Sequence, residues 1–138
     1  MMKKQILIIS TIIFSLLMLI WSGCKKDSSP EIETFIIQID SIIHADTINF
    51  GDNLIIKYYG KIGPDGCYSF DEIAPEYIAG TLSVTCWGKH TFESVCTQDT
   101  VYMVGKTLQV SEIPVGKTII KAMQPDGTNI SQSVYVKE

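Results

Sequence analysis

Hydrophobic and polar residues alternate along most of the chain after Glu31, and this period of two is typical of half-buried β-strands. The clearest runs of apolar residues on one parity are Phe35, Ile37 and Ile39; Leu54, Ile56 and Tyr58; Leu82, Val84 and Cys86; and Val134 and Val136. No stretch of about ten residues in this region has the i, i+3, i+4, i+7 spacing of an amphipathic helix. The pattern therefore predicts an all-β domain.

Turn signals separate these runs. Pro64-Asp65-Gly66 and Pro125-Asp126-Gly127 combine a residue with a preset φ, a side chain that bonds its own backbone and a residue that accepts positive φ. Gly51-Asp52-Asn53 is a third turn, and Gly105-Lys106 resembles a hairpin turn. Turns about every eight to twelve residues predict an all-β sandwich or barrel. At this length we favour an immunoglobulin-like antiparallel β-sandwich of seven or eight strands over residues 32–138 to a closed barrel.

Two segments help to define the strand boundaries. A short strand is expected from about Cys67 to Phe70, and the last strand from about Ile130 to Lys137. Asp71 to Ala79 is the least strand-like segment, because Pro75 interrupts it.

The first residues follow a different pattern. Lys3 and Lys4 precede a nearly continuous apolar run from Ile6 to Ile20, and small residues stand just before Cys24. A positive start, a short apolar run and a small-residue cleavage site are typical of a secretory signal. The alternative is an uncleaved anchor helix, although the run is short for a span of about 20 residues.

Ser22-Gly23-Cys24 resembles the lipobox of bacterial lipoproteins, with Trp21 in place of the usual aliphatic residue. The resemblance implies that residues 1–23 form a helical signal peptide, and that Cys24 carries the lipid that attaches the protein to a membrane. Residues 24–31 are polar and would form a flexible tether. A lysine directly after the cysteine, here Lys25, resembles the pattern of lipoproteins that are sorted to the outer membrane. The resemblance fits a domain on either the periplasmic or the outer face of that membrane.

Charge excludes one class of partner. All 15 acidic residues lie after the signal, so loss of Lys3 and Lys4 takes the net charge from −4 to −6. The chain contains no Arg. An acidic chain without Arg argues against nucleic-acid binding, which depends on basic patches.

The remaining cysteines suggest one disulfide. With Cys24 assigned to lipid, Cys67, Cys86 and Cys96 remain in a compartment that permits disulfides. Cys86 shares a parity with Leu82 and Val84, which favours a core position. Cys67 and Cys96 flank turn-like segments, so we pair them; the closed loop of about 30 residues would add on the order of 3 kcal/mol.

A second resemblance covers most of the mature chain. The run from Tyr59 to Phe70, together with Trp87-Gly88, Val95-Cys96-Thr97 and the Gln124–Gly127 turn, is similar to small envelope lipoproteins of uncharacterised function. It implies an immunoglobulin-like fold and a Cys67–Cys96 bridge, and it brings no known activity.

Catalytic and metal-binding patterns are not found. His44 and His90 could in principle hold a metal with Asp46 or Glu93, but no ligand spacing supports this, and solvated turn histidines are expected instead. Gly-x-Ser-x-Gly and glycine-rich phosphate loops are absent from the sequence. We therefore predict no catalytic residue, no metal and no cofactor.

Aromatic residues offer the best candidate ligand contacts. Tyr59, Tyr77 and Trp87 are expected at or near the surface, where such side chains stack on sugars or peptides. The first hypothesis is a non-catalytic module that binds a protein or glycan partner in the cell envelope. The alternatives are an enzyme or enzyme inhibitor whose site is assembled only in three dimensions, and a purely structural lipoprotein.

Overall fold

The alternating segments form nine β-strands in the computed structural model, which describes residues 30–92 and 95–138. The strands are β1 (Ile32–Ile36), β2 (Gln38–Ile43), β3 (Thr47–Asn49), β4 (Leu54–Gly63), β5 (Tyr68–Ile78), β6 (Thr81–Thr91), β7 (Val101–Val110), β8 (Gly116–Met123) and β9 (Asn129–Lys137). No helix occurs within these described ranges, so the all-β prediction is confirmed. The signal peptide, Cys24 and most of the expected tether lie outside the described residues.

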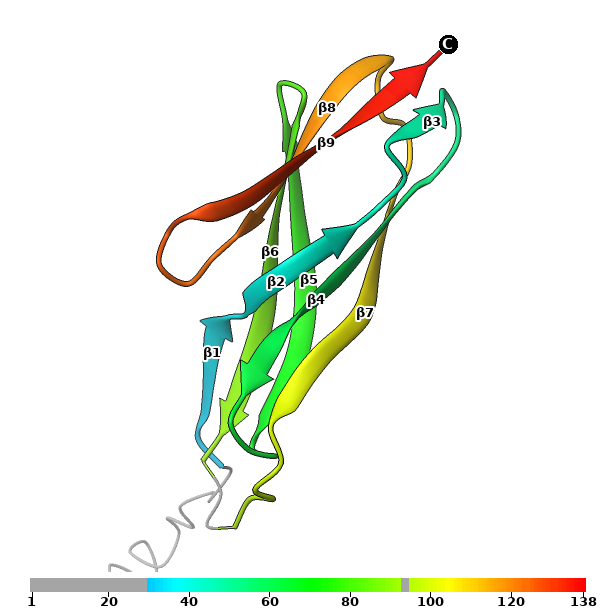
Figure 1. Ribbon diagram of the computed structural model, residues 1–138. Helices are drawn as coiled ribbons and strands as arrows, with labels where there is room; N and C mark the ends of the chain where they lie inside the picture. The colour runs from blue at the N-terminus through cyan, green and yellow to red at the C-terminus, as the bar shows by residue number, and fades with distance from the viewer. Residues whose placement is uncertain (1–29, 93–94) are drawn as a thin grey trace, which may run out of the picture.

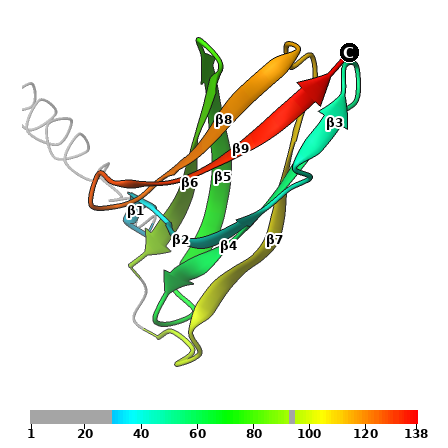
Figure 2. The ribbon, with the colours of Figure 1, turned by 45° about the horizontal axis from the view of Figure 1, so that its top comes forward.

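The strands form two sheets that face each other (Figures 1 and 2). The smaller sheet has three strands in the order β2-β4-β7. In the six-stranded sheet, β5 pairs with one edge of β6, and β1 and β8 share the other edge, followed by β9 and β3. The described chain enters at the lower end of Figure 1, where β1 begins, and its C-terminus lies at the opposite end.

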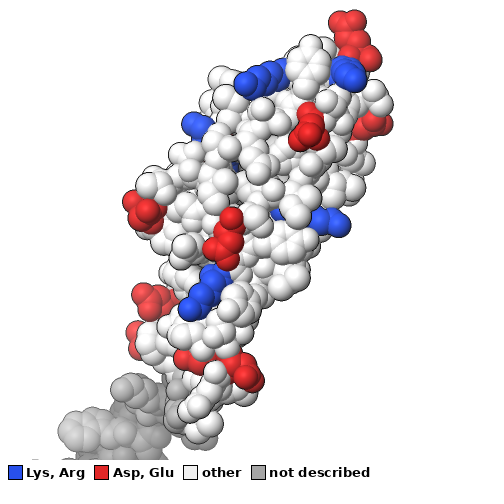
Figure 3. All heavy atoms as spheres, in the orientation of Figure 1, with Lys and Arg blue, Asp and Glu red and all other residues white. Residues whose placement is uncertain are grey.

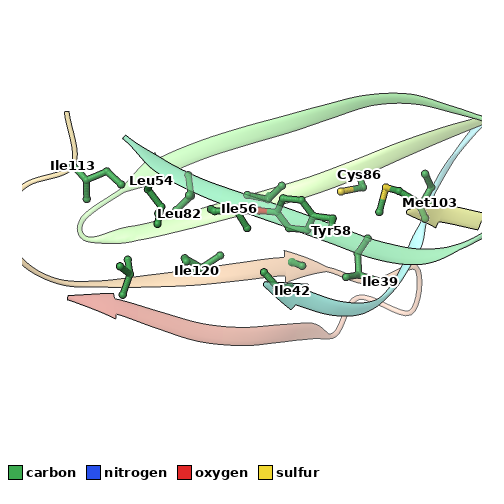
Figure 4. Close-up of a cluster of buried hydrophobic side chains, with 14 of the residues drawn as sticks. Ile39, Ile42, Leu54, Ile56, Tyr58, Leu82, Cys86, Met103, Ile113 and Ile120 are labelled. Carbon is green, nitrogen blue, oxygen red and sulfur yellow. The ribbon is translucent and has the colours of Figure 1, made fainter. Parts of the chain in front are cut away.

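The apolar side chains that alternate along the strands point into the space between the two sheets, as predicted. Ile56 and Tyr58 from β4 meet Val84 and Cys86 from β6 in one apolar core, in which all four side chains are fully buried (Figure 4). Val134 and Val136 of β9 also face inward, as expected. Burial of these apolar surfaces is the main force that holds the two sheets together.

The first strand segment divides where the chain changes sheets. Phe35, Ile37 and Ile39 read as one run, but β1 pairs with β6 whereas β2 pairs with β4. Ile37, between them, is fully buried and donates its N–H to the Cys86 carbonyl at 2.8 Å. This division and the short β3 raise the strand number above the expected seven or eight.

The sheets are not purely antiparallel, which corrects the prediction. β6 pairs with β8 in parallel, and so does β3 with β9. A parallel pair needs a long crossover. The chain provides one between β6 and β8 by running through β7 in the other sheet.

Two local predictions are wrong. Asp71–Ala79 is not irregular, because β5 runs through Pro75 to Ile78. Proline is tolerated there because β5 pairs with β6 alone among the described strands, which leaves its other edge unpaired by them. Gly105-Lys106 is not a hairpin turn either: β7 is continuous, and Gly105, with φ +61°, lies at a register shift opposite β4.

Two glycines admit aromatic rings at the end of the sandwich where β1 begins. A Cβ on Gly63 of β4 would collide with the Tyr68 ring, and one on Gly88 of β6 would collide with the Phe35 ring. These rings make an edge-to-face contact with centroids 5.6 Å apart. The glycines therefore let an aromatic cluster close this end of the core.

Candidate functional site

A groove of about 470 Å³ lies on the outer face of the larger sheet, beside Trp87. Trp87 alternates with buried Cys86 and Gly88 on β6, so its indole points away from the core. The side chain is half-buried. The groove is lined by Ala74, Pro75, Glu76, Ser83, Thr85, Trp87 and Met123.

Small side chains create this groove. Ala74 of β5 lies opposite Thr85 of β6, and Glu76 lies opposite Ser83. The short Ala, Ser and Thr side chains leave space next to the large indole of Trp87. The groove therefore places the indole beside small apolar and hydroxyl side chains on two paired strands.

Hydroxyl and carboxylate groups supply the polar contacts of the groove. Ser83 and Thr85 offer hydroxyls that both donate and accept, and the Glu76 carboxylate accepts. An indole face with such groups around it suits a ring that carries hydroxyl groups, which can stack on the aromatic surface and hydrogen-bond at its edge.

Charges around the groove are mixed, with an acidic excess. Glu72 is the register partner of Trp87 on β5, and Lys121 of β8 is the register partner of Ser83. Together with Glu76, these give two acids to one lysine. Lys89, the next outward residue of β6, pairs with Asp71 at 3.4 Å. The surroundings therefore disfavour an anionic ligand.

The structure does not bring the three predicted aromatics together. Tyr59 lies on the outer face of the smaller sheet, since its neighbour Tyr58 points into the core. Tyr77 pairs with Leu82 at the far end of β5, and its hydroxyl lies 3.4 Å from Thr118 Oγ1. Tyr77 lines a separate hollow of about 210 Å³ with Val110, Ser111, Glu112 and Ile113. Trp87 alone belongs to the groove.

The histidines occupy different environments. His90 stacks on Tyr68 with ring centroids 4.3 Å apart and meets Phe92 edge-on at 4.4 Å. His44 Nδ1 lies 2.8 Å from the Ala45 carbonyl, and its buried Nε2 has no partner in the part of the chain that the structure describes. Within residues 30–92 and 95–138, no hydrogen bond joins either ring to a carboxylate or a serine. Glu93, the acid considered with His90, lies outside the described residues.

The predicted disulfide between Cys67 and Cys96 is present, with the two Cα atoms 5.4 Å apart. Asp65 Oδ1 accepts the Cys67 N–H at 2.9 Å, as expected for the Pro64-Asp65-Gly66 turn. The ligand atoms of Asp65, Cys67 and Cys96 lie within 4.8 Å of one another. Because both sulfurs are committed to the disulfide, they cannot bind a metal as thiolates.

Cys86 forms no disulfide within residues 30–92 and 95–138, and it is fully buried in the core, as its parity suggested. Burial raises the pKa of its thiol to about 12. Burial, and secondarily the neighbouring Cys86, also raises the pKa of Tyr58. Both groups stay neutral at physiological pH, so Cys86 acts as a small apolar side chain and not as a nucleophile.

Sequence reasoning expected Trp87 at or near the surface but did not identify the residues beside it. Ser83 and Thr85 share the outward parity of Trp87 on β6, and this alternation was a usable signal. The pairing of Ala74 and Glu76 with that strand does not follow from the sequence, because Pro75 predicts an irregular segment there.

No helix in the described part of the chain has the length and hydropathy needed to cross a membrane. No protein-family model matches the chain, and neither does any curated protein or solved structure.

Proposed function

We propose that this protein is a non-catalytic binding module of the bacterial cell envelope, and that the groove beside Trp87 is its ligand site. The observation that carries the proposal is the outward-facing indole on a rigid strand pair, next to the hydroxyls of Ser83 and Thr85 and the Glu76 carboxylate. The ligand class that fits is a neutral glycan. An anionic glycan would meet the acidic excess around the groove.

The proposed attachment to the envelope is a lipid on Cys24. Its support lies in the sequence: Lys3 and Lys4, the apolar run to Ile20 and the Ser22-Gly23-Cys24 motif. Acyl chains contribute about 0.8 kcal/mol for each buried CH₂, so several chains anchor almost permanently. The lysine after the cysteine favours the outer membrane, and a Cys67–Cys96 disulfide suits an exported protein.

We also propose that the fold is a variant of the immunoglobulin-like sandwich. Support comes from the two facing sheets and from the first strand segment, which changes from one sheet to the other at Ile37. The parallel pairs β6–β8 and β3–β9 depart from a purely antiparallel arrangement.

Trp87 gives the proposal a direct test. The chain has two tryptophans, and removal of the signal would take Trp21 away. Trp87 would then be the only source of tryptophan fluorescence in the mature protein. Titration of the detergent-purified protein with neutral hexose and N-acetylhexosamine oligosaccharides should change its emission, and sulfated oligosaccharides should not.

Variants assign that signal to the groove. Trp87→Ala should weaken binding at least tenfold in calorimetry, which corresponds to about 1.4 kcal/mol. Tyr102→Ala is the matched control, because Tyr102 is exposed on β7 of the other sheet and should not affect affinity. Equal affinity of the Trp87→Ala variant, or no response to any neutral oligosaccharide, would refute the glycan site.

A further inference from the structure

Three apolar side chains are exposed where the described chain enters the domain. Ile32 is 57% exposed, Phe92 49% and Val95 81%. We call these three residues the base patch. Ile32 and Phe92 lie at the same end of the paired strands β1 and β6, because Ile32 pairs with Thr91 and Phe92 donates its N–H to the Glu31 carbonyl at 2.9 Å. Ile32 shares the face of Thr91, so the Ile32 and Phe92 side chains border this end of the sheet on opposite faces.

The base patch is held by rigid parts of the fold. Phe92 meets the His90 ring edge-on, and His90 in turn stacks on Tyr68, so an aromatic column links Phe92 to the core. Val95 directly precedes Cys96, which the disulfide ties to Cys67. Exposed apolar groups that are fixed in this way lose little conformational freedom when they bind a surface.

The position of the base patch next to the N-terminal end of the domain points to the membrane as its partner. Pro30, the first described residue, adjoins Glu31 and Ile32, so the chain leading to the anchor leaves from the patch itself. From Cys24 to Pro30 the chain spans at most about 25 Å, even fully extended. An anchored protein therefore keeps the patch close to its bilayer, and this high effective concentration favours a contact that would be weak alone.

We infer that the base patch inserts into the interface of the bilayer to which the chain is attached, so that the domain is oriented by the membrane as well as tethered to it. This inference rests on the proposed membrane anchoring. Aromatic and aliphatic side chains at a membrane interface bury apolar surface at the level of the head groups.

The charges beside the base patch indicate which lipid head groups it can approach. Glu31 and Glu33 flank Ile32, and both are exposed. Figure 3 shows acidic side chains at the lower end of the molecule. These carboxylates repel anionic lipids, so a zwitterionic surface is the matching partner.

A tryptophan placed in the patch tests the inference. The full chain is prepared with Trp21→Leu and Trp87→Phe, so that Phe92→Trp supplies its only tryptophan. Tyr135→Trp in the same background is the matched control, because Tyr135 is 52% exposed on β9, near the opposite terminus. Both proteins are reconstituted into phosphatidylcholine vesicles with or without bromine on the acyl chains.

Bromine on acyl chains quenches only tryptophans that reach the bilayer. We expect at least twofold stronger quenching at position 92 than at position 135, together with blue-shifted emission, and a loss of that difference when Ile32→Ser and Val95→Ser are added. Equal quenching at the two positions would overturn the inference. Mass spectrometry of the same sample measures the lipid on Cys24 separately. A chain without acyl mass that still shows quenching at position 92 would refute the lipid anchor but support the insertion of the base patch.

Discussion

Gln124 binds both backbone groups of Ile39, although the two residues are 85 positions apart. Its Nε2 donates to the Ile39 carbonyl and its Oε1 accepts the Ile39 N–H, each at 3.1 Å. Gln124 follows β8 in the larger sheet and Ile39 belongs to β2 in the smaller one, so one buried amide joins the two sheets. It does so just before the register shift that separates Ile39 from Ser41 in β2.

Gln124→Ala should therefore destabilise the fold by about 1–3 kcal/mol, because it leaves the Ile39 N–H and C=O buried without partners. The free energy of unfolding in urea measures this change. Gln109→Ala, at an exposed position on the outer face of β7, is the control and should alter stability by less than about 0.5 kcal/mol. Equal effects of the two substitutions would show that the Gln124 pair contributes nothing.

Removing the disulfide should cost about 3–4 kcal/mol, since it closes a loop with a sequence separation of 29 residues. The Cys67→Ala/Cys96→Ala double variant tests this by denaturation. Alkylation of the unsubstituted protein, denatured without reduction, independently counts its reactive thiols. One reactive thiol indicates the bridge plus a lipidated Cys24, and two indicate the bridge with Cys24 unmodified. Three or more would be incompatible with the bridge.

Alkaline pH should weaken the fold through the buried Cys86. Its pKa in the folded state is raised from the model-compound value of 9.0 to about 12. Folding thus favours the neutral thiol, so its contribution is complete below about pH 9 and is lost as pH rises towards 12. Each such group lowers stability by up to about 1.4 kcal/mol per pH unit in that window.

Denaturation between pH 8 and 11 measures this slope. Cys86→Ala should reduce it, whereas Ser83→Ala on the outer face of the same strand should leave it unchanged. A slope that is identical in both variants would assign the alkaline sensitivity to other groups.

The Tyr58 hydroxyl is fully buried and has no hydrogen-bond partner among the described residues. Tyr58→Phe keeps the ring and removes this orphaned polar group, so it should stabilise the fold by about 1 kcal/mol or more at neutral pH. It should also flatten the fall in stability above pH 10, because the pKa of Tyr58 is raised by burial. A destabilised Tyr58→Phe variant would mean that the hydroxyl has a partner in solution.

The sequence predicted those parts of the fold that depend on local pattern. Alternation placed Ile56, Val84 and Val134 in the core, and each is buried. Turn chemistry located Pro64–Gly66 and Pro125–Gly127 correctly. Cys86 lies in the core, as expected, because it follows the parity of Leu82 and Val84 on the same strand.

Long-range features were not predictable in this way. Alternation cannot show that a chain changes sheets at Ile37, since the buried parity continues across the break. A glycine that bends a continuous strand, as Gly105 does, has the same sequence signature as one that reverses it. The groove depends on which strand lies beside β6, and no single-strand pattern encodes the pairing of Ala74 with Thr85.

The entry of the chain at one end of β1 has a mechanical consequence. If the cell surface is pulled against a ligand held beside Trp87, tension passes from the anchor into β1 and through its antiparallel pairing with β6. Because the force is applied at the N-terminal end of β1 and parallel to the strand, it loads all the β1–β6 hydrogen bonds together in shear. It does not peel them apart one by one. This geometry would make the link between the groove and the proposed anchor resistant to force.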